Sequence, residues 1–248
     1  MRLKLLSAIF DPGTIRHLEA CGVEHGWNCL EVGGGNGSIA AWLSNRVGVN
    51  GHVLVTDIDA RFLEAANVSN VEVRRHNIVT DPLPEEAFDL VHSRLVLLHL
   101  TEREKALHRM ISALKPGGWL LVEEFDSASL MGDPTVNSVE ILPKTHLAML
   151  HLLEDHGVER RCGRLLLGRL RSQGLVALGA EGRMFMWQGG SDGAALLQAN
   201  YEQLRAQMID AGYITGDEFE QDVAALQEAE FAMPSPIMWS VWGRRPAA

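Results

Sequence analysis

The stretch LEVGGGNGS, residues 30–38, decides how the first half of this chain can fold. It follows an apolar run and precedes the helical pattern of residues 37–48, so its glycines lie in a predicted strand-to-helix turn. Glycines at 33, 35 and 37 let the backbone approach a ligand closely, with helix N–H groups pointing at that ligand. Taken alone, the turn fits either a ligand site or a tight loop without a ligand.

The spacing of these glycines disfavours two common phosphate-binding motifs. A dinucleotide fingerprint needs the pattern G-x-G-x-x-G, and position 38 is a serine here. A triphosphate-binding loop would end in Gly-Lys-Ser or Gly-Lys-Thr, and the stretch contains no lysine. A nicotinamide oxidoreductase is therefore disfavoured.

A second acidic residue points to a nucleoside. Asp57 ends a predicted strand, twenty residues after Gly37, where a carboxylate can accept hydrogen bonds from both hydroxyls of a ribose. Asp59 is the competing acid, but it falls just past the strand, where an exposed or helix-capping role is expected.

Short apolar runs alternate with helical patterns from Trp27 to Asp126, which is typical of βα units around a parallel sheet. The predicted strands have apolar centres that suit burial on both faces, and they cover 29–33, 52–57, 71–76, 88–93 and 119–125. The predicted helices cover 37–48, 61–67 and 101–118. Thr101 and Glu104 form the pattern of a capping box at the start of the last helix.

The pattern becomes mainly helical beyond Asp126. Helices are predicted at 133–157 with a break or kink at Pro143, and at 163–174, 193–212 and 217–231. Strand regions are predicted at 176–190 and 235–245. We expect one domain over 1–248: a helical lead-in (1–26, with its helix at 11–22), a ligand-binding core (27–126), helical cap segments (127–162 and 193–232) and a C-terminal sheet region (163–192 and 235–245).

Composition restricts the class of ligand. The net charge of −10 disfavours a nucleic-acid partner, because phosphate binding needs clustered Lys and Arg. The three cysteines have no metal-like spacing, and no apolar run has the roughly 18–20 residues of a membrane span. We expect a cytoplasmic protein that acts on a small molecule, with no nucleic-acid or membrane partner. Whether the protein forms a homodimer is left open.

Four segments resemble, in order and spacing, the class I S-adenosylmethionine-dependent methyltransferases that act on small molecules, such as the UbiE, type-11 and type-12 groups. They are LEVGGGNGSIA, VLVTDID, HNIVTDPLPEEAFDLVHSRLVLLHL and ALKPGGWLLVEE, within residues 27–125, and the tail PIMWSVWGRR is similar more loosely. The resemblance implies an α/β, Rossmann-like fold: a seven-stranded, mostly parallel sheet with an antiparallel last strand, plus a helical cap insertion. It also implies S-adenosyl-L-methionine at the C-terminal ends of the strands.

The resemblance places the methionine part of the cofactor beside the first motif and the end of the fourth strand. The matching residues are Glu31, Gly33, Gly35, Gly37, Ser93 and Arg94. The amino group of the cofactor is cationic, so an acid such as Glu31 suits it where it would not suit a phosphate.

The same resemblance assigns the nucleoside part. Asp57 matches the ribose-binding acid, and Ile58 matches the apolar residue beside the adenine. Asn77 and Ile78 match the pair that contacts the edge and face of the adenine. The family often has aspartate at the first of these positions, and asparagine keeps a carbonyl oxygen for the adenine amino group.

Histidines are the candidates for catalysis, because methyl transfer requires a positioned nucleophile and, where needed, a base that titrates near neutrality. His146 and His151 lie on the segment expected to cover the site. They are five residues apart, so we do not expect them to act as a pair on one helix face. His92 and His99 flank the end of the fourth strand and are interpreted as packed structural residues.

Further acids lie at the end of the fifth strand. Glu123, Glu124 and Asp126 are candidates for substrate contacts, and strand alternation sends the first two to opposite faces. No metal is expected, because VHSRL at 91–95 offers no carboxylate or amide ligand at the end of the fourth strand.

The expected function is methyl transfer to a small molecule, with a hydroxyl of a natural product or aromatic compound ahead of a nitrogen or carbon acceptor. This implies a role in secondary metabolism. The alternative is a methyltransferase-like protein that uses the cofactor for a rearrangement or cyclisation, because the fold does not fix the chemistry. A protein or RNA methyltransferase is disfavoured by the acidity of the chain.

Overall fold

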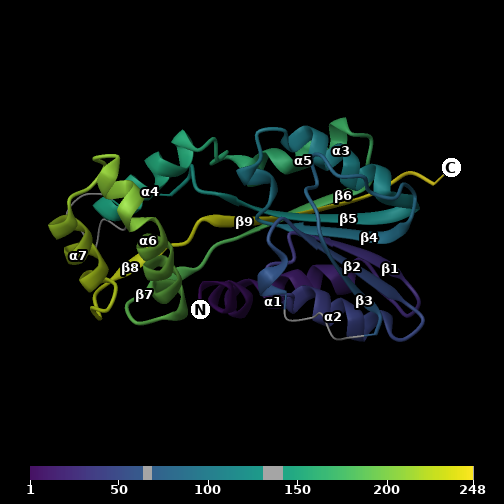
Figure 1. The fold of residues 1–248 in the computed structure, drawn as a ribbon, viewed down its shortest axis with the longest axis horizontal. Helices are drawn as coiled ribbons and strands as arrows, with labels where there is room; N and C mark the ends of the chain where they lie inside the picture. The colour runs from purple at the N-terminus through teal and green to yellow at the C-terminus, as the bar shows by residue number, and fades with distance from the viewer. Residues whose placement is uncertain (64–68, 131–141, 248) are drawn as a thin grey trace.

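The computed structural model describes residues 1–63, 69–130 and 142–247. Its centre is a seven-stranded sheet in the order β3-β2-β1-β4-β5-β9-β6 (Figure 1). The strands are β1 (Asn28–Val32), β2 (His52–Asp57), β3 (Val71–Arg75), β4 (Phe88–Arg94), β5 (Leu114–Asp126), β6 (Val176–Arg183) and β9 (Ile237–Arg244). The last strand, β9, lies antiparallel between β5 and β6, which confirms the predicted fold class.

The strands are buried on both faces because their apolar side chains alternate between two cores. Leu30 packs with Val91 in the core under α3 (Arg103–Ala113) and α5 (Cys162–Ser172). Cys29 packs with Leu90 in the core under α1 (Arg2–Ala20) and α2 (Ser38–Val47). The period of two along each strand therefore produces a three-layer structure, with helices on both faces of the sheet (Figure 1).

A third core lies beyond one end of the sheet (Figure 1). It is built from α4 (Lys144–Asp155), α6 (Asp192–Asp210), α7 (Gly216–Ala225) and a two-stranded sheet of β7 (Met186–Gln188) and β8 (Ala232–Pro234). Phe10 of α1 packs in this core with Tyr201 and Phe219. Helix α1 thus contacts both the main sheet and this helical cap.

Several predicted boundaries are wrong. Helix α1 begins at Arg2 and continues through Pro12, although we expected it to begin at residue 11. Helix α3 begins after Glu102 without a side-chain cap, so the capping box of Thr101 and Glu104 does not form. The chain from Leu114 already belongs to β5, with a register shift between the pairs Phe88–Leu114 and Leu90–Trp119 that accommodates the Pro-Gly-Gly segment.

The later helices are also shorter than predicted. The region 176–190 divides into β6 of the main sheet and β7 of the small sheet, and α7 ends at Ala225 instead of residue 231. The predicted helix at 61–67 is a 3-10 turn, η1 (Ala60–Phe62), where the structure describes it. Residues 64–68 and the first part of the predicted helix at 133–157, up to residue 141, lie outside the described residues. No described helix is long and apolar enough to cross a membrane.

Candidate functional site

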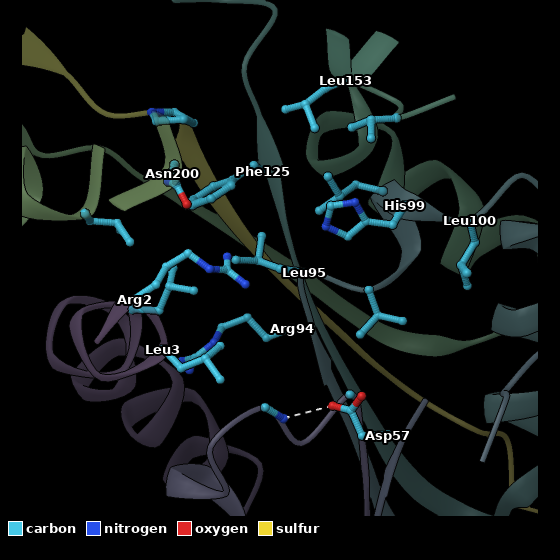
Figure 2. Close-up of a pocket in the computed structure, with 18 of the residues that line it drawn as sticks. Arg2, Leu3, Asp57, Arg94, Leu95, His99, Leu100, Phe125, Leu153 and Asn200 are labelled. Carbon is cyan, nitrogen blue, oxygen red and sulfur yellow. Dashed lines mark hydrogen bonds between the residues drawn. The ribbon is translucent and has the colours of Figure 1, made fainter. Parts of the chain in front are cut away.

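A cavity of about 650 Å³ lies at the C-terminal ends of β1, β2 and β4, between the sheet and helices α1, α4 and α6. Eight of the ten predicted cofactor residues line it: Glu31, Gly33, Gly35, Asp57, Ile58, Asn77, Ile78 and Arg94. Gly37 and Ser93 do not. Figure 2 shows Asp57 at one end of this cavity and Phe125 and Asn200 toward the other.

The glycine turn requires glycine for two different reasons. Gly33 and Gly35 have φ values of +76° and +56°, in the left-handed region that side chains disfavour. A Cβ atom on Gly33 would also lie 2.3 Å from Cγ2 of Val96, and one on Gly34 would lie 2.3 Å from Cγ1 of Val55. Gly37, with φ +80°, caps α2 outside the cavity. The turn therefore keeps bare backbone against the cavity.

Asp57 is held at the end of β2 by the backbone. The N–H of Gly35 donates to its Oδ2 at 3.1 Å, and the N–H of Asp59 donates to its Oδ1 at 2.9 Å (Figure 2 shows the first). Asp59 itself caps the 3-10 turn by accepting from the N–H of Arg61, and it does not line the cavity. Asp59 thus has the capping role that the sequence predicts, and Asp57 lines the cavity.

The wall beside Asp57 is apolar and partly uncovered. Ile58 lines the cavity with 65% of its surface exposed, whereas Ile78 is buried. The Oδ1 atom of Asn77 accepts from the N–H of Val79 at 2.9 Å. This bond leaves one lone pair of that oxygen for a ligand, so the expected acceptor of the adenine amino group is already partly used.

A fully buried histidine lies behind the glycine turn. His92 has its Nδ1 2.7 Å from Oε2 of Glu31 and its Nε2 3.5 Å from Oε2 of Glu123. Burial alone would lower the pKa of His92, but the charges and hydrogen bonds of the two glutamates outweigh it and raise this pKa to about 9. Burial would likewise raise the pKa of Glu123, and His92 instead holds it at about 2. His92 is therefore an imidazolium at neutral pH.

The same cluster connects β4 and β5 to their neighbours. Glu123 accepts hydrogen bonds from the hydroxyls of Thr14 on α1 and Ser240 on β9. Arg94 donates to Thr14 at 2.9 Å and forms an ion pair with Asp11 at 2.7 Å. Charged and hydroxyl groups thus connect α1 to the strand ends that form the cavity floor.

Ser93 and the acids at the end of β5 are internal residues. The hydroxyl of Ser93 is buried and has no hydrogen-bond partner in the described part of the chain. Glu124 accepts from the backbone N–H groups of residues 96, 97 and 98, and burial raises its pKa to about 8. Asp126 pairs with Arg164. Since Glu123, Glu124 and Asp126 are buried away from the cavity, our interpretation of them as substrate contacts is wrong.

The structure separates the two predicted catalytic histidines. His146 lines the cavity and is 1% exposed, with Nδ1 3.0 Å from the hydroxyl of Tyr201 and no hydrogen-bond partner for Nε2 among the described residues. Burial lowers the pKa of His146 to about 4, so it is neutral. His151 is exposed, lies beside Tyr213 and does not line the cavity.

The place of His99 differs from the one predicted from the sequence. It ends the 3-10 turn η3 (Leu97–His99) after β4, and its side chain is accessible and lines the cavity, as Figure 2 shows. The interpretation as a packed residue is wrong. Desolvation by the surrounding cavity wall and then the charge of Arg2 lower the pKa of His99, so it is neutral at pH 7. Its position one short turn after Arg94 is the sequence signal that could have identified it.

Fold and site together define a Rossmann-like α/β protein with a nucleoside-sized site at the strand ends. Within the described residues, no group of three or more His, Cys, Asp or Glu could hold a metal ion.

Residues 30–122 match the family described as "Methyltransferase domain". The ubiquinone/menaquinone biosynthesis C-methyltransferase UbiE of Vibrio campbellii is 34% identical over 140 residues, which are 51% of this chain and 53% of that protein. The chain thus spans about half the length of the curated relatives it matches.

Solved structures share the fold. One of the protein BH2331 from Bacillus halodurans has a TM-score of 0.60 at 15% identity, covering 94% of this chain and 98% of that one. The [4+2]-cyclase SpnF has a TM-score of 0.60 at 18% identity, covering 96% and 82%. Residues 30–122 thus match the methyltransferase-domain family, and the solved structures extend the similarity of fold over almost the whole chain.

Proposed function

We propose that this protein transfers a methyl group from S-adenosylmethionine to a small, largely apolar acceptor, and that the accepting atom is a hydroxyl oxygen. The observation that carries this proposal is the continuity of the cavity. A single cavity runs from the acid and the bare glycine backbone at the strand ends to an apolar chamber under α4 and α6. A cofactor and an acceptor can therefore lie side by side.

The residues at the strand ends fit the cofactor. Asp57 has a free lone pair on each oxygen for the ribose hydroxyls, and the exposed face of Ile58 offers a flat apolar wall to the adenine. Ile78 and Asn77 complete that wall. Gly33 and Gly35 leave room for the methionine part beside Glu31. We assign Gly37 and Ser93 to the structure of the turn and strand, because neither lines the cavity.

Charge supports this assignment. Glu31, His92 and Glu123 form a buried cluster of two carboxylates and one imidazolium, which leaves one net negative charge. The positive charge of Arg94 is balanced by Asp11. A cationic amino group beside Glu31 would neutralise the remaining charge, whereas a phosphate would add to it.

The chain supplies alignment and a base for the reaction. Bound S-adenosylmethionine offers a methyl carbon on a cationic sulfur; transfer breaks this carbon–sulfur bond and forms a carbon–oxygen bond to the acceptor. The neutral imidazole of His99 accepts the proton of the acceptor hydroxyl. His146 holds the acceptor through its unpartnered Nε2, with Tyr201 fixing the ring. His151 receives no role, because it lies outside the cavity wall.

Calorimetry with S-adenosylmethionine tests the proposal. We expect binding to the intact protein, loss of binding in Asp57→Ala and retention in Asp59→Ala, which carries the matched acid outside the cavity. Failure of the folded wild-type protein to bind would overturn the proposal.

A carbon acceptor is the second candidate, favoured by the name of the curated relatives, which are C-methyltransferases. NMR of the methylated product separates the two, because O-methyl and C-methyl carbons have different chemical shifts. Release of S-adenosylhomocysteine with turnover separates both from a rearrangement or cyclisation. The cyclase among the structural neighbours is 18% identical and shows only that this fold occurs with that chemistry.

The cap belongs to the same proposal. We propose that 1–248 acts as one methyltransferase domain, in which the segments 127–162 and 193–232 close the acceptor chamber through α4 and α6. The burial of Phe10 from α1 in the same core as Tyr201 of α6 supports this, because it connects the lead-in helix to the cap.

A further inference from the structure

One cation in the cavity wall has no partner among the residues that the structure describes. The charged residues that line the cavity are Arg2, Glu31, Asp57, Arg94, Glu159 and Arg160. Four are in ion pairs, Glu31 with His92, Arg94 with Asp11, Glu159 with Arg161 and Arg160 with Glu154. Asp57 accepts two backbone N–H groups. Arg2 has neither a hydrogen bond nor an ion pair with any residue of 1–63, 69–130 or 142–247.

Arg2 is directed into the cavity. Figure 2 shows its side chain extending from α1 into the middle of the cavity, toward Leu95, with Phe125 and Asn200 above it. The residue is half-buried, and burial lowers its pKa. A partly desolvated guanidinium that no described carboxylate contacts is unfavourable, because it loses water without gaining a direct ion pair.

The surroundings increase the attraction of Arg2 for an anion. The chamber beyond it is walled by apolar side chains, among them Leu95, Phe125, Met149, Leu150, Leu153 and Leu197. A charge pair in such a low-dielectric space attracts more strongly than the same pair in water. Guanidinium also matches the two oxygens of a carboxylate or phosphate with a two-pronged hydrogen bond.

We propose that Arg2 binds an anionic group on the methyl acceptor, so that the acceptor is an amphiphile with an apolar body and a carboxylate or phosphate. This inference rests on the proposed function, because it names the acceptor class of the same cavity. The apolar body fills the chamber under α4 and α6, and the anion sits on Arg2.

The position of Arg2 favours the acceptor over the cofactor as the source of the anion. The charge of Arg2 acts on His99, the proposed base. Asp57, which marks the nucleoside end, lies farther down the cavity in Figure 2. An acceptor anchored on Arg2 would thus present its nucleophile near His99. The carboxylate of the cofactor is the competing source, and the experiment separates the two.

The test uses two probes of the same shape and different charge, 4-phenylbutyrate and its amide 4-phenylbutanamide. Their binding is measured by calorimetry at pH 7.5 on the protein saturated with S-adenosylhomocysteine. We expect the carboxylate to bind about tenfold or more tightly than the amide, the size of a charge-assisted hydrogen bond. Arg2→Met keeps the apolar stem and should abolish the preference. Lys4→Met, an exposed change of the same charge on the same helix, should preserve it.

The results that would contradict this inference can be told apart from one another. Equal binding of the two probes by the wild-type protein, or binding of neither, overturns the inference without using a variant. A preference that persists in Arg2→Met also overturns it. Weaker S-adenosylhomocysteine binding in Arg2→Met, with the probe preference unchanged, assigns Arg2 to the cofactor instead. Failure of the wild-type protein to bind S-adenosylhomocysteine or S-adenosylmethionine is a failure of the proposed function itself.

Discussion

His92 Nδ1 lies 2.7 Å from Oε2 of Glu31, and both side chains are buried behind the glycine turn. Replacing His92 by glutamine would leave Glu31 and Glu123 without their shared cation. We expect His92→Gln to lower the free energy of unfolding by about 3–5 kcal/mol, the usual cost of an uncompensated buried charge. Denaturant unfolding measures this, and His108→Gln, an exposed histidine on α3, is the control that should leave the midpoint unchanged. An equal effect in both variants would contradict the pairing.

The same pair predicts a pH dependence. The pKa of His92 is about 9 in the folded protein, above its usual 6.5, so the folded state holds a proton that the unfolded state releases between these values. The stabilisation is therefore complete below about pH 6.5 and is lost as the pH rises through 9. We expect the difference in unfolding free energy between wild type and His92→Gln to shrink over this window. The contribution of Glu124 to the pH dependence is the same in both proteins and cancels in this difference. A pH-independent difference would show that His92 is neutral.

Strand register limits how much of this cluster could be predicted from the sequence. Glu31, His92 and Glu123 lie on three different strands, and they meet because Glu31 pairs with His92 and Arg94 pairs with Glu123 across the sheet. Apolar runs and glycine turns predict that these strands exist, but not which residues stand opposite each other. The sequence therefore predicted Glu31 as a site residue and not its partner.

The residues of the nucleoside end could be predicted from the sequence because they follow the strand ends directly. Asp57 closes β2 and the glycines close β1, and parallel strands bring such ends to one edge. The histidines were harder, since His92 and His99 flank the same strand end and differ only after the chain turns at η3. One is buried and the other is accessible, a difference that tertiary packing creates.

The glycine turn predicts a steric effect. Gly34→Ala would place a Cβ atom 2.3 Å from Cγ1 of Val55 and 2.8 Å from Cδ2 of Leu63, in a wall that is already packed. We expect a loss of roughly 1–3 kcal/mol in unfolding free energy and weaker S-adenosylmethionine binding. Gly216→Ala, whose Cβ meets nothing within 4 Å at the start of α7, is the matched control. Calorimetry and thermal unfolding measure both, and unchanged cofactor affinity in Gly34→Ala would show that the turn does not shape the site.

The ion pair of Arg94 with Asp11 predicts a role for α1 in forming the cavity. Asp11→Asn removes the anion at 2.7 Å and leaves Arg94 partly buried without its counter-charge. We expect weaker cofactor binding, by about fivefold or more, because Arg94 is then free to move into the cavity and repel a cationic ligand. Glu19→Gln, an exposed acid on the same helix, should bind as wild type does. Tighter binding by Asp11→Asn would show that Arg94 does not act on the cofactor cation.

His99 gives the sharpest test of the chemistry. If its imidazole takes the acceptor proton, His99→Gln should lower kcat by about 10²–10⁴-fold, the usual contribution of a general base, with little change in cofactor affinity. The base must be neutral to act, so wild-type activity should fall as the pH drops through a pKa below the usual 6.5 of histidine, and this limb should vanish in His99→Gln. His108→Gln should retain the full profile, because it lies exposed on α3. Full activity of His99→Gln with an unaltered acid limb would remove His99 as the base and direct attention to His146, which also lines the cavity and whose Nε2 has no hydrogen-bond partner among the described residues.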